Sequence, residues 1–364
     1  MTSHDFKSAA NAAIDAPAAN QAIARELLSG ASERPCFIVG RNEQSSGLIG
    51  GLRLDGLVDD FAEPGSDWRG LPIVSTAQLP GDAIVINCST SISPVAVEQR
   101  IKAAGIGSVV SIHELISAAA GGIEQPRFVQ DQREDWRLFD AEWGEVFDSL
   151  EDKPSRQILL DLVRYRLTAN TQFMQDYAIR VKDQYFEPFL DLRSEVFVDA
   201  GGFDGDTTEE FCRRYPDYRK VHLFEPSQRN MRAAKARLEA HRDIVFHQEG
   251  LSDQVGSMTF DAEAGSASAV TSGPGEEVQM TTLDLAVAEP VSFIKMDLEG
   301  WELTALAGCE RHIRDDRPKL AIAVYHRASD FRTVWRYARS IHPDYKVYLR
   351  HYTQGWSETV MFFV

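Results

Sequence analysis

The chain has 364 residues, of which 43% are hydrophobic, and 38 Lys and Arg against 55 Asp and Glu give it a formal net charge of -17. This length suffices for two domains with cores of their own, and the negative charge argues against a nucleic-acid partner or an anionic membrane surface. Because the sequence shows neither a signal peptide nor a bilayer-length apolar run, we expect a cytoplasmic protein without a membrane span. The four cysteines form no CxxC pair, which is typical of reduced, buried thiols.

Residues 1–123 are predicted to form a Rossmann-like domain. The apolar runs CFIVG, LPIVS, DAIVINCS and SVVSI alternate with helical patterns, which indicates a mostly parallel sheet with crossover helices. The first run continues into GRNEQSSG, which lacks the GxGxxG spacing of a dinucleotide-binding loop. The series VGRNEQSSG, GLVDD and DAIVINCS resembles the N-terminal nucleotide-sugar-binding domain of sugar acetyltransferases. A purely structural role for this domain is the alternative.

A helical connector is predicted over residues 124–190. Four apolar residues recur at the three- and four-residue intervals of one helix face: Leu159, Leu162, Val163 and Leu167. Pro154 suits the first turn of that helix, where no intrahelical hydrogen bond is lost.

Residues 191–364 repeat the alternation of strands and helices more strongly. The strand candidates are EVFVDAG, KVHLFEP, IVFHQEGL, VSFIKMDLEG, KLAIAVYH, KVYLRHY and TVMFFV. Only a short QGWSE stretch separates the last two, so we expect an antiparallel hairpin at the edge of a mostly parallel sheet. The expected fold class is therefore α/β, with two Rossmann-like domains joined by the helical connector.

Glycines and acids gather where the first of these strands ends, in VFVDAGGFDGDTT. Its glycines, which would bring a ligand close to bare backbone, are Gly201, Gly202 and Gly205. Asp199, Asp204 and Asp206 in the same turn would repel a pyrophosphate but attract a ligand that carries an ammonium and a sulfonium. Glu225 ends the next strand, where an acid can accept hydrogen bonds from ribose hydroxyls. S-Adenosylmethionine has all of these features and is the predicted cofactor.

Five motifs in order resemble the FkbM family of S-adenosylmethionine-dependent methyltransferases: VFVDAGGFDGDTTEEF, VHLFEPS, GLSDQVGSMTF, MTTLDL and FIKMDLEGWELTALAGC. The resemblance covers about residues 185–364. It implies a class I methyltransferase fold and methylation of a hydroxyl, often on a sugar of a glycan or secondary metabolite. The cofactor-binding residues expected on this basis are Asp199, Gly201, Gly202, Gly205, Asp206, Thr207, Glu225, Ser252, Asp253 and Asp297.

Methylation of a hydroxyl requires that its proton be removed. His326 ends the fifth strand candidate and is the first candidate for the general base, since an imidazole can be neutral at working pH. Asp297 and Glu299, in KMDLEG, are the competing pair, and with His326 they could instead hold a divalent cation such as Mg²⁺. Asp297 could equally bind the ammonium of the cofactor or pair with Lys295.

Aromatic and cationic side chains around the final hairpin suit a sugar face and an anionic substituent, such as the diphosphate of a nucleotide-sugar. The predicted acceptor-binding residues are Tyr325, Arg350, His351, Tyr352 and Trp356. The alternative is a hairpin that packs on its own helix.

The leading hypothesis is an S-adenosylmethionine-dependent O-methyltransferase that acts on a sugar or sugar-linked precursor in glycan or secondary-metabolite biosynthesis. One alternative is a non-catalytic nucleotide-sugar-binding protein with a role in assembly or regulation. Another is an NAD-dependent oxidoreductase, which would be expected to carry a GxGxxG loop. The expected partner is a small-molecule or glycan acceptor rather than a nucleic acid, and homo-oligomerisation is left open.

Overall fold

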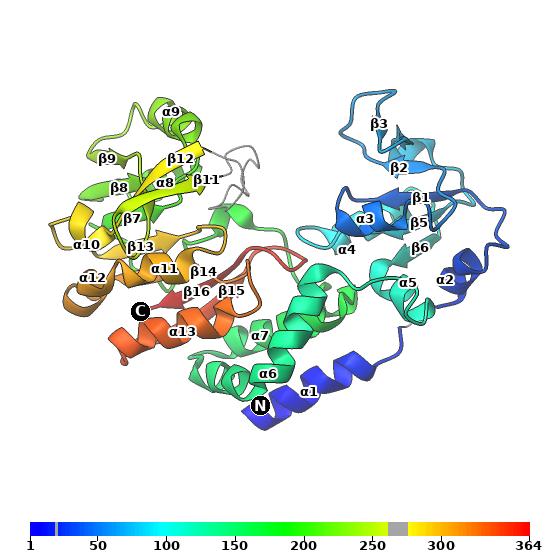
Figure 1. Ribbon diagram of the computed structural model, residues 1–364, viewed down its shortest axis with the longest axis horizontal. Helices are drawn as coiled ribbons and strands as arrows, with labels where there is room; N and C mark the ends of the chain where they lie inside the picture. Colours follow the sequence, from blue (N-terminus) through cyan, green and yellow to red (C-terminus); the bar gives the residue numbers. More distant parts are fainter. Residues whose placement is uncertain (19–20, 261–275) are drawn as a thin grey trace. The chain divides into compact units, whose positions relative to one another are not determined.

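The computed structural model of the protein describes residues 1–18, 21–260 and 276–364, and its chain divides into two compact units (Figure 1). The first unit comprises Met1–Asp140, Gln157–Ile179 and Tyr352–Ser357. The second unit comprises Ala141–Arg156, Arg180–His351 and Glu358–Val364. Whether residues 1–123, 124–190 and 191–364 fold as separate domains stays a prediction. Among the described residues, no helix has the length and apolar character needed to cross a bilayer.

A six-stranded sheet lies at the centre of the first unit, with the order β3-β4-β2-β1-β5-β6. Its strands are β1 (Cys36–Val39), β2 (Gly56–Val58), β3 (Asp67–Trp68), β4 (Leu71–Val74), β5 (Ile84–Asn87) and β6 (Ser108–Ser111). All neighbours pair in parallel except β3 and β4. The predicted mostly parallel sheet is confirmed.

Helices cover both faces of this sheet. Alternate residues of β1 face opposite ways, so Cys36 and Ile38 join one apolar cluster and Phe37 and Val39 join another. The first cluster includes residues of α2 (Gln21–Leu28), α3 (Glu43–Leu48) and α5 (Ile112–Ala118), and the second includes residues of α4 (Pro94–Ala103). Burial on both faces explains why these strands read as continuous apolar runs in the sequence.

A seven-stranded sheet with the order β15-β16-β14-β13-β7-β8-β9 forms the centre of the second unit. Its strands are β7 (Val196–Ala200), β8 (Lys220–Phe224), β9 (Ile244–His247), β13 (Phe293–Met296), β14 (Lys319–Ala323), β15 (Val347–His351) and β16 (Thr359–Phe363). β16 pairs antiparallel with both β14 and β15, while the other neighbours are parallel. The antiparallel hairpin predicted at the sheet edge is confirmed.

The prediction that IVFHQEGL forms one strand is wrong. β9 ends at His247, and the next residues form β10 (Gly250–Leu251) in a separate three-stranded sheet with β11 (Gly256–Phe260) and β12 (Glu276–Thr281). The chain enters the three-stranded sheet at Gly250, where a Cβ would lie 2.7 Å from the sulfur of Met280 on the neighbouring strand. Glycine therefore permits this close approach of two strands.

The helices of the second unit are α8 (Asp206–Arg214), α9 (Gln228–Arg237), α10 (Leu283–Ala286), α11 (Glu302–Ala307), α12 (Glu310–Asp315) and α13 (Asp330–Ile341). α8 packs on the sheet through Phe211, whose ring centroid is 4.4 Å from that of Phe197 on β7. Leu223 on β8 packs against Met231 of α9 in another buried cluster. These contacts fix the ends of β7 and β8, where the candidate site lies.

Three further helices belong wholly or partly to the first unit: α1 (Ser3–Asp15), α6 (Arg127–Ser149) and α7 (Lys153–Thr168). α6 has a non-helical backbone at Phe139, one residue before the first unit ends at Asp140. The apolar face predicted for α7 is buried. Arg166 on the same helix is also buried. Its guanidinium donates to Gln132 Oε1 (3.2 Å) and to the carbonyl oxygen of Trp356 (3.0 Å), which offsets part of the cost of burying it.

Candidate active site

The candidate site lies at the carboxyl ends of β7 and β13, where the strand order of the second unit reverses. Gly201 follows β7 with a φ of +77° and packs against Asp297, which follows β13. A Cβ on Gly201 would lie 2.0 Å from the carbonyl oxygen of Asp297. The protein's own backbone therefore requires glycine here, whether or not a ligand is bound.

Packing also explains the other two glycines of this loop. A Cβ on Gly202 would lie 2.5 Å from the side chain of Leu223. Gly205, the N-cap of α8, has a φ of +85°, and a Cβ there would lie 2.9 Å from Leu238. Close packing within the protein is therefore sufficient to explain all three glycines, without a ligand against their backbone.

Asp199 is fully buried and pairs with Lys295, which is also buried. Its Oδ1 lies 3.0 Å from Lys295 Nζ, and its Oδ2 accepts a hydrogen bond from the hydroxyl of Thr208 (2.7 Å). Lys295 Nζ also donates to the carbonyl oxygen of Gly201 (2.8 Å). Burial alone would lower the pKa of Lys295, but the charges of Asp199 and Asp297 outweigh it and raise that pKa.

The turn after β7 carries less free charge than its sequence suggests. Asp204 lies 2.6 Å from the guanidinium of Arg237. Asp206 is exposed at the start of α8, and its carboxylate accepts a hydrogen bond from the backbone N–H of Thr207 (2.7 Å). The prediction that Asp199, Asp204 and Asp206 together repel a pyrophosphate is wrong for Asp199 and Asp204, because Lys295 and Arg237 compensate their charges.

Glu225 follows β8 and holds the glycine loop in place. Its Oε2 accepts a hydrogen bond from the backbone N–H of Phe203 (3.0 Å). Its Oε1 accepts from the backbone N–H of Ser227 (2.9 Å) and from the side chain of Asn230 (3.3 Å). Burial raises the pKa of Glu225 to about 7, so this carboxyl changes charge near neutral pH.

Three of the sequence motifs meet near Ser252. The backbone N–H of Ser252 donates to the carbonyl oxygen of Thr281 (2.8 Å). A Cβ on Gly308 would lie 1.9 Å from the carbonyl oxygen of Ser252. Its hydroxyl donates to Asp253 Oδ1 (3.1 Å), and Asp253 is exposed. Ser252 is therefore fixed by packing, while Asp253 is the member of the predicted pair that a ligand can reach.

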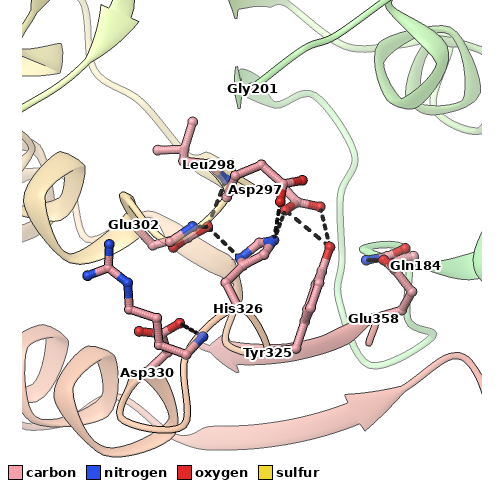
Figure 2. A network of polar contacts seen from close by, with 12 residues as sticks. Gln184, Gly201, Asp297, Leu298, Glu302, Tyr325, His326, Asp330 and Glu358 are labelled. Carbon is pink, nitrogen blue, oxygen red and sulfur yellow. Dashed lines mark hydrogen bonds and ion pairs between the residues drawn. The ribbon is translucent and has the colours of Figure 1, made fainter. Parts of the chain in front are cut away.

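Carboxylates surround the imidazole of His326, which follows β14 (Figure 2). Nε2 lies 3.3 Å from Asp297 Oδ1 and 3.3 Å from Glu299 Oε2, while Nδ1 lies 3.0 Å from Glu302 Oε1. Glu302 is buried and also accepts hydrogen bonds from the backbone N–H groups of Leu298 (2.7 Å) and Gly300 (3.3 Å).

This cluster favours the protonated form of His326. Burial alone would lower the pKa of His326, but its interactions with Glu299, Glu302 and Asp297 outweigh burial and raise that pKa well above the usual range. Among the described residues, Asp297, Glu302 and His326 also bring one ligand atom each within 4.8 Å of the others, close enough to share a cation. A positive charge, proton or metal, is what this arrangement favours.

Two tyrosines and a glutamine extend the cluster. Tyr185 donates its hydroxyl to Asp297 Oδ2 (2.7 Å), and Tyr325 donates to both oxygens of the same carboxylate (3.4 Å each). Gln184 donates to Oε2 of Glu358 (2.9 Å), the residue before β16 (Figure 2). Burial raises the pKa of Glu358 to about 7. The structure thus brings the predicted residues Asp297, Tyr325 and His326 together with groups that the sequence analysis missed.

The missed residues are Tyr185, Glu302 and Glu358. Glu302 lies within FIKMDLEGWELTALAGC and could have been found, because it is the next acid after Glu299 in a motif already singled out. Tyr185 and Glu358 have no such signal. Their backbones are left-handed, with φ of +73° and +62°, as is that of Glu299 with +53°. Three non-glycine residues in this conformation mark a site where the surrounding fold imposes the backbone geometry.

The hairpin residues predicted to bind the acceptor are held by other side chains. Arg350 lies 2.6 Å from Asp152 and 3.7 Å from Glu187, so its charge is compensated. His351 is buried, and its Nδ1 is 2.9 Å from the hydroxyl of Thr359. Two more, Tyr352 and Trp356, belong to the first unit. Their role in acceptor binding stays a prediction.

Residues 199–353 match the family model of the methyltransferase FkbM domain. The chain carries an FkbM methyltransferase domain. The fold of the whole chain is similar to the crystal structure of methyltransferase FkbM from Methylobacillus flagellatus KT, with a TM-score of 0.75, 24% identity and 100% of each chain covered. At this identity the likeness shows the fold alone.

Two other solved structures are similar to part of this chain. A putative rRNA methylase from Clostridium thermocellum has a TM-score of 0.33 and 10% identity, covering 47% of this chain and 85% of its own. An rRNA methylase from Streptococcus thermophilus has a TM-score of 0.32 and 20% identity, covering 47% and 87%. At such scores neither carries an argument about this chain. No curated protein matches it.

Replacing Lys295 by Met should leave the Asp199 carboxylate buried and unpaired, which should cost about 3 to 5 kcal/mol of unfolding free energy. Chemical denaturation followed by circular dichroism measures this loss. The double variant Lys295→Met with Asp199→Asn should recover most of it, because the amide carries no charge and still accepts from Thr208. As a control, Arg193→Met breaks an exposed pair with Asp191 and should cost no more than about 1 kcal/mol. Equal losses in Lys295→Met and the control would refute the structural role of the buried pair.

Proposed function

We propose that this FkbM methyltransferase transfers a methyl group from S-adenosylmethionine to a hydroxyl of a sugar or sugar-linked precursor in glycan or secondary-metabolite biosynthesis. The observation that carries the proposal is the position of the His326 cluster. It lies at the carboxyl ends of β13 and β14 in the same sheet whose β7 and β8 ends present the glycine loop and Glu225. We call the ends of β7 and β8, with the glycine loop and Glu225, the cofactor edge, and the ends of β13 and β14, with the His326 cluster, the acid–base edge. The two edges adjoin where the strand order reverses.

The residues at the cofactor edge fit a nucleoside with a free ribose. Glu225 Oε2 accepts one backbone N–H, so it keeps the capacity to accept from a ribose hydroxyl as well. Exposed Asp206 and Asp253 provide negative charge and hydrogen-bond acceptors on either side of it in the chain. S-Adenosylmethionine bound here would supply an electrophilic methyl group to the acceptor oxygen and would leave as S-adenosylhomocysteine.

The acid–base edge favours an uncharged, hydroxyl-rich acceptor. The carboxylates of Asp297, Glu299 and Glu358 accept hydrogen bonds from hydroxyls, whereas they would repel a phosphate. A sugar can donate several such bonds at once. The carboxylates therefore favour the sugar ring rather than a diphosphate as the part of the acceptor that lies beside His326.

His326 can take the hydroxyl proton only after it has lost its own. Glu302 holds Nδ1, so Nε2 is the atom that faces the acceptor side together with Asp297 and Glu299. As a base acting alone, Nε2 must first release a proton that the carboxylates stabilise. A divalent cation on Asp297, Glu299 and His326 is the second candidate, because carboxylate-rich sites bind hard cations and such a cation lowers the pKa of a coordinated hydroxyl.

The first test concerns Glu225 and uses S-adenosylhomocysteine in calorimetry. Glu225→Ala should weaken binding by about 1.5 to 3 kcal/mol, the range for hydrogen bonds to a charged group. Ribose hydroxyls favour the ionised carboxyl, whose pKa in the free protein is about 7. Wild-type affinity should therefore rise by up to about tenfold between about pH 6 and about pH 8.

The control for this test is Glu239→Gln, which changes an exposed acid near α9 and should bind as wild type does. Glu225→Gln should bind weakly at both pH values, because its amide cannot ionise. Wild-type affinity in Glu225→Gln, with the same pH dependence, would remove the ribose assignment.

The second test decides between the base and the cation at His326. Methyl transfer to a panel of nucleotide-sugars and glycan fragments is followed by mass spectrometry. If His326 acts alone, His326→Ala should lower turnover by about 10² to 10⁴ and leave S-adenosylhomocysteine affinity intact. The rate should then rise only above neutral pH, because Glu299, Glu302 and Asp297 raise the pKa of His326, and EDTA should have no effect.

A shared cation predicts a different pattern. EDTA should suppress methyl transfer, and Mg²⁺ or Mn²⁺ should restore it, because oxygen-rich sites bind these ions reversibly. Rescue by metal would exclude the base-only mechanism. Wild-type turnover in His326→Ala would exclude both.

A further inference from the structure

The segment between β15 and β16 belongs to a different unit from the strands it joins. Tyr352–Ser357 lies in the first unit, whereas His351 before it and Glu358 after it lie in the second. Within the first unit this segment packs on the loop that follows β5. An ordinary hairpin turn would instead belong to the same unit as its two strands.

Backbone hydrogen bonds attach the segment to the β5 loop. The N–H of Gln354 donates to the carbonyl oxygen of Ile92 (2.8 Å), and the N–H of Trp356 donates to that of Thr90 (3.1 Å). A third bond runs from the N–H of Ser357 to the carbonyl oxygen of Ser91 (3.3 Å), so three successive carbonyl groups of the β5 loop accept from this segment.

The fit is close at the centre of the segment. A Cβ on Gly355 would lie 2.2 Å from the carbonyl oxygen of Ser91 and 2.3 Å from that of Thr90, so no larger residue can occupy this position without moving the backbone. The hydroxyl of Ser357 also donates to Ser91 (2.9 Å). The ring of Trp356 stacks on that of Phe128, with centroids 5.9 Å apart.

This docking place is where an open α/β sheet holds a ligand. The strand order of the first unit reverses between β1 and β5, and the loop after β5 lies at the carboxyl ends of the strands. A phosphate there would use the N-terminus of α4. Instead, Gln354 Oε1 accepts the backbone N–H of Ala96 in the first turn of α4 (2.9 Å), and Gln354 Nε2 donates to the carbonyl oxygen of Tyr177 (3.0 Å).

The loop after β1 closes the same place from the other side. A Cβ on Gly40 would lie 3.0 Å from the backbone nitrogen of Ser89, so the β1 and β5 loops are in contact. Asn42 donates to the carbonyl oxygen of Cys88 (2.6 Å), and its Oδ1 accepts from the N–H of Ser45, capping α3. Three donors beside this place, the N–H groups of Ala96 and Ser45 and the side-chain amide of Asn42, are thus already bonded within the protein.

We propose that the strand-end site of the first unit is filled by this chain's own Gln354–Ser357, and that the unit serves to position Glu358 rather than to bind a nucleotide-sugar. Glu358 is the next residue along the chain, and its left-handed backbone turns directly into β16. Its carboxylate bonds Gln184 beside the Asp297 cluster. Gln354 and Gly355 are then positioning residues for the methyltransferase site, a role that rests on the proposed function.

Hydrogen exchange and calorimetry on the full chain test this docking. Gly355→Ala should displace the segment, and Gln354→Ala, a milder change, should loosen it. In both variants the amides of Gln354, Trp356 and Ser357 should exchange about tenfold faster or more, because each loses its acceptor on the β5 loop. S-Adenosylhomocysteine affinity should stay within about twofold of wild type, since the glycine loop and Glu225 are untouched. The matched control is Gly107→Ala, where a Cβ meets nothing within 4 Å.

Turnover separates positioning from mere stability. At a temperature where all variants are folded, kcat for the acceptor should fall about tenfold or more in Gln354→Ala with cofactor affinity unchanged, and should not fall in Gly107→Ala. Unchanged exchange or unchanged kcat in Gln354→Ala would overturn the proposal. So would calorimetric binding of UDP-glucose to wild type with protection of residues 88–96. Failure of wild type to bind S-adenosylhomocysteine would instead overturn the proposed function.

Discussion

The ion pair of Asp199 and Lys295 is the interaction on which the methyltransferase site depends. The two residues lie directly opposite each other on β7 and β13, the strands at which the sheet order reverses. Their charges are fully buried, so each is tolerable only beside the other. Because Lys295 also binds the carbonyl oxygen of Gly201, the pair fixes the start of the glycine loop, and with it the approach of that loop to Asp297.

The site concentrates groups that a stable core would avoid. Four acids, Asp297, Glu299, Glu302 and Glu358, lie around one histidine, and two of them have left-handed backbones. Like charges at these distances repel, and the backbone conformation adds strain, so packing elsewhere must offset both. Such an arrangement stabilises a proton, a cation or a set of donor hydroxyls placed at its centre. Clusters of this kind are concentrated at functional sites, which is the basis for placing the proposed reaction here.

The strands, and the acids that follow them, could be predicted from the sequence because each β/α unit has its own local pattern of apolar residues. EVFVDAG and VSFIKMDLEG predict buried strands, and the acids that end them necessarily share one edge of the sheet. The reasons why particular residue types occupy particular positions could not be predicted in this way. Gly201 is glycine because of Asp297, nearly a hundred residues later, and Asp199 is neutralised by Lys295 across the sheet. Tyr185 and Glu358 reach the cluster only through tertiary folding, so no local spacing could reveal them.

The composition of the first unit makes sense if its ligand is a piece of the same chain. A phosphate-binding loop keeps helix N–H groups free and uses glycines to admit the ligand to the backbone. Here Gly40 admits the β5 loop, and the amide of Gln354 takes the helix donor. A carboxamide satisfies that donor without adding charge to a protein that is already acidic. In the proposed arrangement, the binding edge of the first unit holds a neutral peptide segment, and that binding helps to order the residue that follows it.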